Sequence, residues 1–567
     1  MSVFIGYPSF MAYQMMKGKK GNNDDFPSIP GITTRYSALG LTNEQMAENP
    51  VWKDLTGKGH DLQMKNFAWK GMSGVGGYTE NYDSNRWYKV ASRIDITWTY
   101  KSFNVKSIKA NNLAQLFYQS LPSDTGFRVL SCTIKVSGLT DGQGIEYVSN
   151  GAQPTVIMRI ENDGIYHLPS FDFGAKNAYY GFKFLKLQES CNITIEQLPL
   201  YPGFIFGDGV DDFAVTEKEL NFEDTYTVYT AFIPFQNNPT RNMILCGADS
   251  KKTFSMQYSS LIYVSFIVGN SYYINADFVN GLNLFACKRN GNNICIKNLL
   301  TNKVVTGTCG DWVENAGLYY LWKNATYASL ARAAIAGQTI CNGYFSTDGD
   351  DEKVLDWYKK QYPWLFPDQA WTVVGKTNED EDRATIANIT GNGNNLVLSN
   401  FGFAEGSGYN EEGECAGYLV TDGVDDKIDS SAFKMGEDFT VVGEWKLLPV
   451  SNYSYAGIIK TNNLYVYNNA SIGISIYVCS SDVRNDMEGL KSLKAICSDG
   501  RVYGEDWTEY KLSIGRTKGA QSSLYLGYNS KAYTKMIFKN LGIYNNQILS
   551  KDDCIKAYNY LQTLKAK

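Results

Sequence analysis

The sequence predicts a mostly β protein in which two similar sandwich modules follow one another and the first is interrupted by an inserted β domain. Three observations predict this fold class: a composition suited to strands, an internal duplication, and unequal spacing between the duplicated motifs. The 567 residues are 14% aromatic and include 40 tyrosines and 52 glycines, but only 14 prolines. Tyrosine favours strands, and glycine favours the tight turns that join them. A chain of this length is expected to form several domains.

The duplication appears when the chain is compared with itself. Residues 54–62 (DLTGKGHDL) match residues 388–396 (NITGNGNNL) at an offset of 334. A second shared motif, D-G-V-D-D, occupies residues 208–212 and 422–426, an offset of 214. The offsets differ by 120 residues, so an insertion of that size lies between the two motifs of the first copy.

These offsets predict the domain boundaries. We expect an N-terminal attachment arm, a first module in two parts, an inserted β domain and a second module, at residues 1–30, 31–78 with 204–367, 79–203 and 368–567. Alternating strand-like runs follow each D-G-V-D-D motif, at 225–232 and 438–445. Within the insertion, only residues 110–121 have a helical appearance.

Each module is expected to end in a short amphipathic helix that covers a sheet, at 350–362 and at 551–564. Ser550 can cap the second of these helices, with Asp552 and Asp553 favourable in its first turn. Binding of a partner by these helices is the alternative.

The charge balance excludes one class of partner. The formal net charge is −5, whereas nucleic-acid binding needs a basic face, so no nucleic-acid partner is expected. The nearest basic run, Lys17, Lys19 and Lys20, is short and is expected to be solvated. Residues 1–16 lack the order of a secretory signal, and no apolar stretch approaches a membrane span. We therefore expect assembly in a cytoplasm and no membrane insertion.

The cysteines and histidines show no metal-site pattern. Eleven cysteines are spread singly without C-x-x-C spacing, and the two histidines are His60 and His167. A zinc site is therefore not expected, and the thiols are expected to be reduced and mostly buried. A disulfide between Cys287 and Cys295, as cross-strand neighbours, is the alternative. No other cofactor is expected.

The two aspartate motifs admit two interpretations. Glycine between carboxylates permits a tight turn, and the Asp side chains can accept bonds from backbone N–H groups at the start of a strand. We favour this structural role and assign no metal. The alternative is calcium, which binds clustered carboxylate oxygens, with the ligands Asp208, Asp211 and Asp212, or Asp422, Asp425 and Asp426.

The motifs together resemble a known family. A module that begins with a strand pair, carries D-G-V-D-D, continues through alternating strands and ends in a helix resembles the laminin-G-like, concanavalin A-like jelly-roll family. The pairing with T-N-E (42–44 and 377–379) and T-G-x-G (56–59 and 390–393) further resembles fibre and decoration proteins of phages of gut Bacteroides-type hosts, including crAss-like phages. The resemblance implies two tandem jelly-roll sandwiches, a virion location and many copies per particle.

Catalytic motifs are not found in the sequence. Residues 56–59 lack the G-x-x-x-x-G-K-[ST] pattern of a phosphate loop, so a hairpin turn is expected there. Jelly-roll glucanases use an E-x-D-x-E or E-x-D-x-x-E strand, but the E-x-D here, Glu161 to Asp163, has no second glutamate in reach. Neither histidine lies in a nucleophile–base motif, and G-x-S-x-G is absent. We therefore predict that the protein is not an enzyme and assign no catalytic residue.

The functional hypothesis is a virion structural protein, either a head or tail fibre or a surface decoration, whose lectin-like modules adhere to host or mucus glycans. The arm would attach it to capsid or tail proteins, and a homo-oligomer is expected, a trimer before a dimer. The alternatives are a glycan-degrading tail spike and a bacterial surface adhesin.

Sugar binding in such folds uses aromatic faces that stack on sugar rings. Turn-like segments carry the candidates Trp87 with Tyr88, Trp312 and Trp507, whereas Trp98 and Trp445 lie on expected strands and are assigned to the core. The carbohydrate-binding residues stay unassigned.

Overall fold

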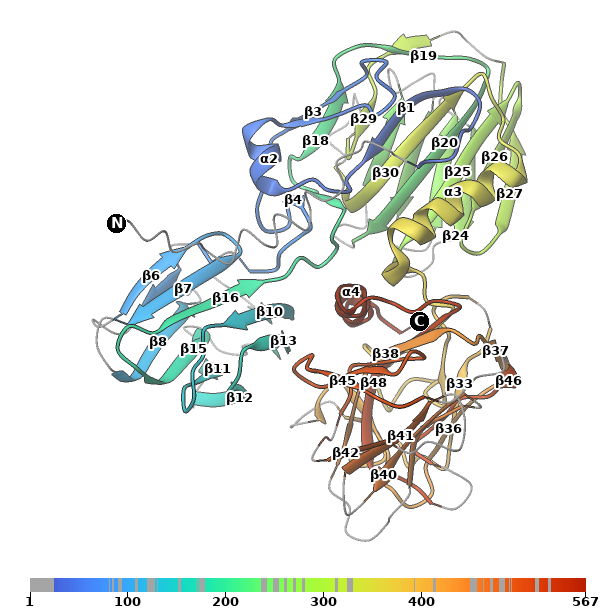
Figure 1. The fold of residues 1–567 in the computed structure, drawn as a ribbon. Coiled ribbons are helices and arrows are strands. Elements are labelled where there is room, and N and C mark those ends of the chain that lie inside the picture. The colour runs from blue at the N-terminus through green and yellow to red at the C-terminus, as the bar shows by residue number, and fades with distance from the viewer. Residues whose placement is uncertain are drawn as a thin grey trace.

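The protein is mostly β, and its antiparallel sheets pack as sandwiches (Figure 1). The computed structural model describes residues 25–566 apart from 81, 84–85, 90–93, 108–110, 120–127, 130, 151–153, 170, 173–178, 236–241, 248–253, 260–262, 269–271, 278–280, 312–314, 324–329, 392, 411–414, 449–455, 462, 470–472, 479–484, 489, 491, 515–519 and 529–531. The expected attachment arm and its lysines lie almost wholly outside the described residues.

The first module is a sandwich of two eight-stranded sheets. One sheet has the order β27 (Lys303–Thr308), β26 (Asn293–Asn298), β25 (Asn283–Asn290), β20 (Thr225–Pro234), β30 (Arg332–Asn342), β17 (Ile205–Asp208) and β4 (Gly74–Val75), with β1 (Ile32–Ser37) also paired to β30. The other has the order β2 (Val51–Trp52), β3 (Leu62–Lys65), β18 (Phe213–Thr216), β29 (Tyr320–Leu321), β21 (Asn242–Gly247), β22 (Phe254–Ser259), β23 (Tyr263–Val268) and β24 (Tyr272–Asp277).

The second module repeats this arrangement. Its first sheet has the order β34 (Gly408–Asn410), β35 (Tyr418–Val420), β48 (Met536–Asn545), β38 (Phe439–Leu447), β43 (Ala495–Cys497), β44 (Arg501–Tyr503) and β45 (Glu509–Lys511), with β31 (Gln369–Thr372) paired to β48. Its second sheet has the order β32 (Thr385–Ile386), β33 (Leu396–Ser399), β36 (Lys427–Ser430), β47 (Tyr525–Leu526), β39 (Ala456–Lys460), β40 (Leu464–Asn469), β41 (Gly473–Val478) and β42 (Asn485–Glu488).

The strands between β4 and β17 form a separate sandwich. Its sheets have the orders β13 (Gly164–Leu168), β10 (Cys132–Ser137), β16 (Asn192–Gln197), β7 (Ser102–Ser107), β6 (Ile94–Trp98), and β12 (Pro154–Ile160), β11 (Gly144–Asn150), β15 (Tyr179–Leu187), β8 (Asn111–Gln119), β5 (Trp87–Lys89). Three two-stranded sheets complete the described strands: β9 (Arg128–Val129) with β14 (Phe171–Asp172), β19 (Leu220–Phe222) with β28 (Asn315–Gly317), and β37 (Phe433–Met435) with β46 (Ala520–Ser522).

The helical expectation for residues 110–121 is wrong, because Asn111–Gln119 is strand β8. Ala114 and Leu116 are fully buried in the core of the inserted sandwich, and the strand pairs along its length with β15. Cross-strand pairing and burial of one face therefore override the helix propensity of the alanine and leucines.

The duplicated motifs form matching turns in the two modules. In the first, Asp54 Oδ1 accepts the backbone N–H of Thr56 at 3.0 Å, inside the turn that joins β2 to β3. In the second, Asn388 Oδ1 accepts the N–H of Thr390 at the same distance. The T-G-x-G segment is therefore a hairpin turn stabilised by one side-chain oxygen, and the hairpin prediction is confirmed.

Helices cover the outer face of one sheet in each module. The structure has α2 (Asn43–Glu48), α3 (Asp348–Gln361), the 3-10 turn η1 (Pro363–Leu365) and α4 (Lys551–Thr563). Thr347 and Asp350 form a capping box at the start of α3. Ser550 accepts the Asp553 N–H at 3.1 Å and caps α4 as predicted. Val354 and Tyr358 of α3 are buried against the sheet.

One apolar cluster, which we call the inter-module core, joins the two modules. It gathers side chains from the first module, from α3, η1 and α4, and from the second module, including Leu284, Trp364, Val442, Tyr544 and Tyr560. Tyr544 of the second module donates to the Trp364 carbonyl at 2.9 Å. Tyr560 of α4 accepts the Leu282 N–H of the first module at 3.2 Å. In Figure 1, α4 lies where the parts of the protein meet.

The cysteines that the structure describes with side chains are free thiols. Cys287 pairs with Ile296 rather than with Cys295, which pairs with Lys288. Neighbouring positions along a strand face opposite sides of the sheet, so the alternative of a Cys287–Cys295 disulfide is wrong. Among the described residues, no helix has the length and apolar character to cross a membrane.

We predict that Tyr560→Ala weakens the coupling between the modules. The ring packs against Trp364, with centroids 6.0 Å apart, and its hydroxyl bonds the first module. Loss of a buried aromatic ring costs about 3 kcal/mol. Calorimetry should show a lower melting temperature and two separated transitions. Lys551→Gln, at an exposed position of α4, is the control and should leave the melting curve unchanged; equal curves for both variants would contradict the prediction.

Candidate functional site: the tyrosine face of the second module

Three tyrosines lie side by side on the outer face of the second sheet of the second module. Tyr465 and Tyr467 lie two residues apart on β40, and Tyr477 lies on β41 directly opposite Tyr465. The ring centroids of Tyr465 and Tyr467 are 5.1 Å apart, and those of Tyr467 and Tyr477 are 5.8 Å apart, with interplanar angles of 25° and 18°. We call this group the tyrosine face; Tyr465 and Tyr477 are half-buried, and Tyr467, between them, is 2% exposed. Leu464 and Val466, which alternate with it, point into the core.

A second aromatic group lies on the same sheet, on the strands toward β36. Tyr525 and Tyr528 have ring centroids 5.7 Å apart, and Tyr528 stacks on Tyr533 at 6.1 Å. The Tyr528 hydroxyl donates to Asp429 of β36. Burial and the hydrogen bond to Asp429 raise the pKa of Tyr528 above its ordinary value. The hydroxyl is therefore protonated and positioned at neutral pH.

Charged and polar side chains border these rings. Lys460 Nζ lies 5.9 Å from the centroid of Tyr465, and Lys427 Nζ lies 5.9 Å from that of Tyr528. Ser475 donates to Asp486 across β41 and β42. Aromatic rings beside hydroxyl, carboxylate and ammonium groups are the combination that recognises a sugar, which has both an apolar ring face and hydroxyls.

The second sheets of the two modules can be compared position by position, because their strands pair in the same register. Ser265 of β23 faces Gln257 of β22 and Asn275 of β24, as Ser475 of β41 faces Tyr467 and Asp486. The register therefore makes Gln257 the counterpart of Tyr467.

By the same register, Ser255 and Ile267 are the counterparts of Tyr465 and Tyr477. The same strands form in the first module with Ser255, Gln257 and Ile267. The same sheet therefore forms without tyrosine at these three positions.

The sequence reasoning missed these residues. On β41, Ile474 and Ile476 point into the core and Tyr477 points outward, which is the pattern of an ordinary half-buried strand. Tyrosine at the outward positions of β40 and β41 was the available signal, but it becomes informative only when the strand register aligns the two modules.

The predicted tryptophan candidates are not exposed platforms. Trp87 is 6% exposed in the core of the inserted sandwich, and Trp507 is 2% exposed in the inter-module core. Tyr88, beside Trp87, is 37% exposed. Trp445 lies in the core as expected, and Trp312 lies outside the described residues. Turn-like flanks did not reveal burial, because tertiary packing decides it.

The aspartate motifs are turns at the start of β18 and β36. Asp208 Oδ1 accepts the Val210 N–H at 2.7 Å, and Asp212 Oδ2 accepts the Asp208 N–H at 2.9 Å. The second module repeats both bonds, at 2.7 and 2.8 Å. Gly209 has φ +77°, which glycine adopts without strain.

In each module, an asparagine from the segment after the T-G-x-G turn donates a hydrogen bond to the aspartate turn. Asn66 donates to the Asp211 carbonyl and Asn400 to the Asp425 carbonyl, each at 3.0 Å. The structural role that we favoured for the motif is thus visible in both modules.

The aspartates of each motif also form a cluster of carboxylates that could hold a metal ion. In each module, one ligand oxygen from each of the three aspartates lies within 4.8 Å of the others. Burial raises the pKa of Asp212 to about 7 and that of Asp426 to about 6. Asp426 is bonded by the Ser407 hydroxyl at 3.0 Å, and Ser73 lowers the pKa of Asp212 in the matching place. The Ser407 hydroxyl thus bonds Asp426 Oδ1, whereas the matching Oδ1 of Asp212 is buried without a hydrogen-bond partner among the described residues.

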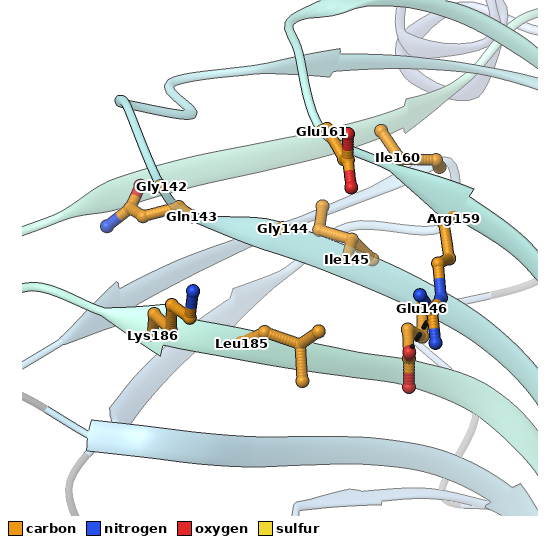
Figure 2. Close-up of a pocket in the computed structure, with 10 residues that line it drawn as sticks. All are labelled: Gly142, Gln143, Gly144, Ile145, Glu146, Arg159, Ile160, Glu161, Leu185 and Lys186. Carbon is orange, nitrogen blue, oxygen red and sulfur yellow. Dashed lines mark ion pairs between the residues drawn. The ribbon is translucent and has the colours of Figure 1, made fainter.

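Figure 2 shows a pocket at the end of the second sheet of the inserted sandwich. Two carboxylates line it, and Glu146 forms an ion pair with Arg159 at 3.1 Å. Glu161 lies above Gly144 and beside Ile160 in this view. The cavity is about 170 Å³, below the roughly 300–1,000 Å³ of small-ligand pockets.

Asp163, the partner of Glu161 in the E-x-D triplet, accepts the N–H groups of Gly138 and Leu139 at 2.9 and 2.8 Å. The triplet therefore holds a turn and does not provide a carboxylate pair.

No protein-family model matches the sequence, and no curated protein matches it. Similar solved structures include the binding domain of botulinum neurotoxin serotype D, with a TM-score of 0.27 and 10% identity over 61% of this chain and 88% of that chain. The serotype C1 binding domain gives a TM-score of 0.25 and 10% identity over 61% and 94%. Similarity of this size carries no argument, so the function has to be inferred from the residues of this chain.

We predict that Asp212→Asn stabilises the protein above neutral pH. A carboxyl whose pKa is raised from 3.8 to about 7 on folding loses its favourable contribution as the pH rises from about 4 to 7. The amide oxygen keeps the bond to Asp208 without a charge. The free energy of unfolding should rise by on the order of 1 kcal/mol at pH 8 and be unchanged at pH 4, as measured by urea unfolding.

Asp211→Asn is the matched control for this experiment: Asp211 is exposed, and its charge is the smallest of the causes that act on Asp212, so the change at pH 8 should be much smaller than that of Asp212→Asn. Calcium distinguishes the two interpretations of the cluster. A melting temperature that rises with added calcium in the native chain, but not in Asp212→Asn, would contradict the turn role.

Proposed function

We propose that this chain is a non-enzymatic glycan-binding protein and that the tyrosine face of its second module is the binding surface. The observation that carries the proposal is the difference between the modules, since Tyr465, Tyr467 and Tyr477 stand where the first module has Ser255, Gln257 and Ile267.

The position of this surface supports the proposal. The opposite sheet of the second module packs into the inter-module core through Val442 and Tyr544. The tyrosine face lies on the outer side of the other sheet, and in Figure 1 β40 and β41 lie at the end of the molecule away from the first module. A large ligand such as a polysaccharide can therefore approach Tyr465 and Tyr477 without meeting the other domains, while the buried Tyr467 packs against both rings.

Within this proposal the protein is a virion component, a head or tail fibre or a surface decoration, that holds a particle on host or mucus glycans. The resemblance of the T-N-E, T-G-x-G and D-G-V-D-D motifs to phage fibre proteins supports this location. The packing of the two modules around α4 suits a display role, because it orients the tyrosine face away from the first module.

Replacing the three tyrosines by their first-module counterparts tests the binding surface. The variant Tyr465→Ser, Tyr467→Gln, Tyr477→Ile keeps side chains that the same sheet already accommodates. Each lost aromatic contact is worth about 1 kcal/mol, so affinity for a glycan found on an array should fall about tenfold or more. Surface plasmon resonance with the purified glycan measures this loss.

The matched control changes two exposed tyrosines of the first module, Tyr272→Ser and Tyr273→Ser, which are 45% and 66% exposed. Binding by this control should equal that of the native chain. Equal affinity for the triple variant and the native chain would refute the tyrosine face as the site. Shortening of the bound glycan during incubation would refute the non-enzymatic role and favour the tail spike.

Mass spectrometry of purified particles tests the virion location separately. Peptides of this chain should be present at many copies per particle. Their absence would contradict the fibre hypothesis. Glycan binding would still be tested separately by the tyrosine variants.

A further inference from the structure

The inserted sandwich contacts the second module through a histidine that is partly buried and whose Nε2 is fully covered. His167 lies on β13, and its ring packs against Tyr558 of α4 with centroids 5.7 Å apart at 84°. Its neighbour across the sheet, Thr133 of β10, bonds Asn559 of α4 at 2.5 Å. Ile165 of β13 packs against the inter-module core. The inserted sandwich is thus held on the face formed by α4 and the second module.

The hydrogen bonds at this contact define the neutral form of His167. Thr133 Oγ1 donates to Asn559 Oδ1, so the same oxygen accepts from His167 Nδ1 at 3.2 Å. The proton of the neutral ring is therefore on Nδ1. Nε2 is buried and has no hydrogen-bond partner among the described residues. A second proton placed there would be a buried charge without an acceptor.

The charges around the ring oppose protonation. Lys539 and Lys494 lie 3.6 and 4.0 Å from the carboxylate of Glu444, and Tyr418 donates to that carboxylate at 2.6 Å. One glutamate between two lysines leaves a net positive charge, to which an imidazolium would add another.

The ionisable groups around His167 come from several elements: Tyr418 of β35, Glu444 of β38, Lys494 before β43, Glu505 and Asp506 after β44, Lys539 of β48, Tyr558 of α4, and Tyr166 of its own strand. Lys494 donates to the Tyr558 hydroxyl at 2.7 Å. Asp506 faces β13 through its carbonyl, next to Gly164. Glu444 is the carboxylate whose charge acts on His167, and it is already held by both lysines and Tyr418.

We propose that His167 is an acid-sensitive lock, which holds the inserted sandwich on the second module while the ring is neutral and releases it when the ring takes up a proton. Release would leave the inserted sandwich attached to the first module through the two chain crossings next to β4 and β17, where Gly76 and Phe204 bond at 2.9 Å. It would expose Tyr558 and Asn559 of α4.

The sign of the effect follows from linkage. Burial, together with Lys539 and Lys494 and against Glu444, lowers the pKa of His167 from 6.5 to about 3. The docked state therefore excludes a proton that the released state binds below about pH 6.5. Docking is unaffected above that pH, and its equilibrium constant falls roughly tenfold for each pH unit below it.

The chain has two histidines, which makes the test specific. Hydrogen exchange of the full-length protein, followed by mass spectrometry from pH 7.5 to 4.5 with correction for intrinsic exchange, should show protection of β13 and α4 decreasing together. His167→Gln, which keeps an N–H toward Thr133 but does not titrate, should retain protection at pH 4.5. His60→Gln is the matched control and should respond to acid as the native chain does.

A second variant keeps the test decisive if His167→Gln fails to dock at neutral pH. Lys539→Met leaves Glu444 better placed to balance an imidazolium, so its loss of protection at pH 4.5 should be smaller than that of the native chain. Constant protection of the native chain across this pH range, or equal acid responses of the native chain and of both the His167 and Lys539 variants, would overturn the proposal.

Discussion

The architecture depends on one constraint, which is that each module has a sheet with two apolar faces. One face packs against the partner sheet of its sandwich, and the other would be exposed if the module stood alone. The terminal helices and η1 cover the exposed face of both sheets by forming the inter-module core. Within it, Trp364 and Tyr560 make contacts that join the two modules. Because apolar burial is the main favourable term in folding, the modules are expected to behave as one cooperative body.

The first sheet of each module packs into that core, so the outer faces of the second sheets are the ones that lie away from it. These two sheets have the same strand order and register, yet their outer faces differ in chemistry. The first carries Ser255 and Gln257, and the second carries Tyr465 and Tyr467. The inward positions of both sheets are apolar, as at Met256 and Val466, whereas the outward positions differ in chemistry.

The inserted sandwich adds a polar contact to this apolar arrangement. Glu444, Lys494 and Lys539 are largely covered where the inserted sandwich meets the second module, with side chains 12–17% exposed. Buried charges need their partners, because removal of one leaves another uncompensated. A contact of this kind specifies one docked geometry more narrowly than an apolar surface does, and it makes docking depend on the protonation of His167.

The sequence alone determined the β class, the duplication, the place of the insertion, the Ser550 cap and the turn chemistry of the aspartates, because these follow from local periodicity and from motifs that repeat along the chain. The tertiary structure alone decided that residues 111–119 form a strand, that Trp87 and Trp507 are buried, and that Tyr465, Tyr467 and Tyr477 share a face. Each of these depends on contacts between residues distant in sequence. Strand register and domain docking set such contacts, and neither leaves a signal in local composition.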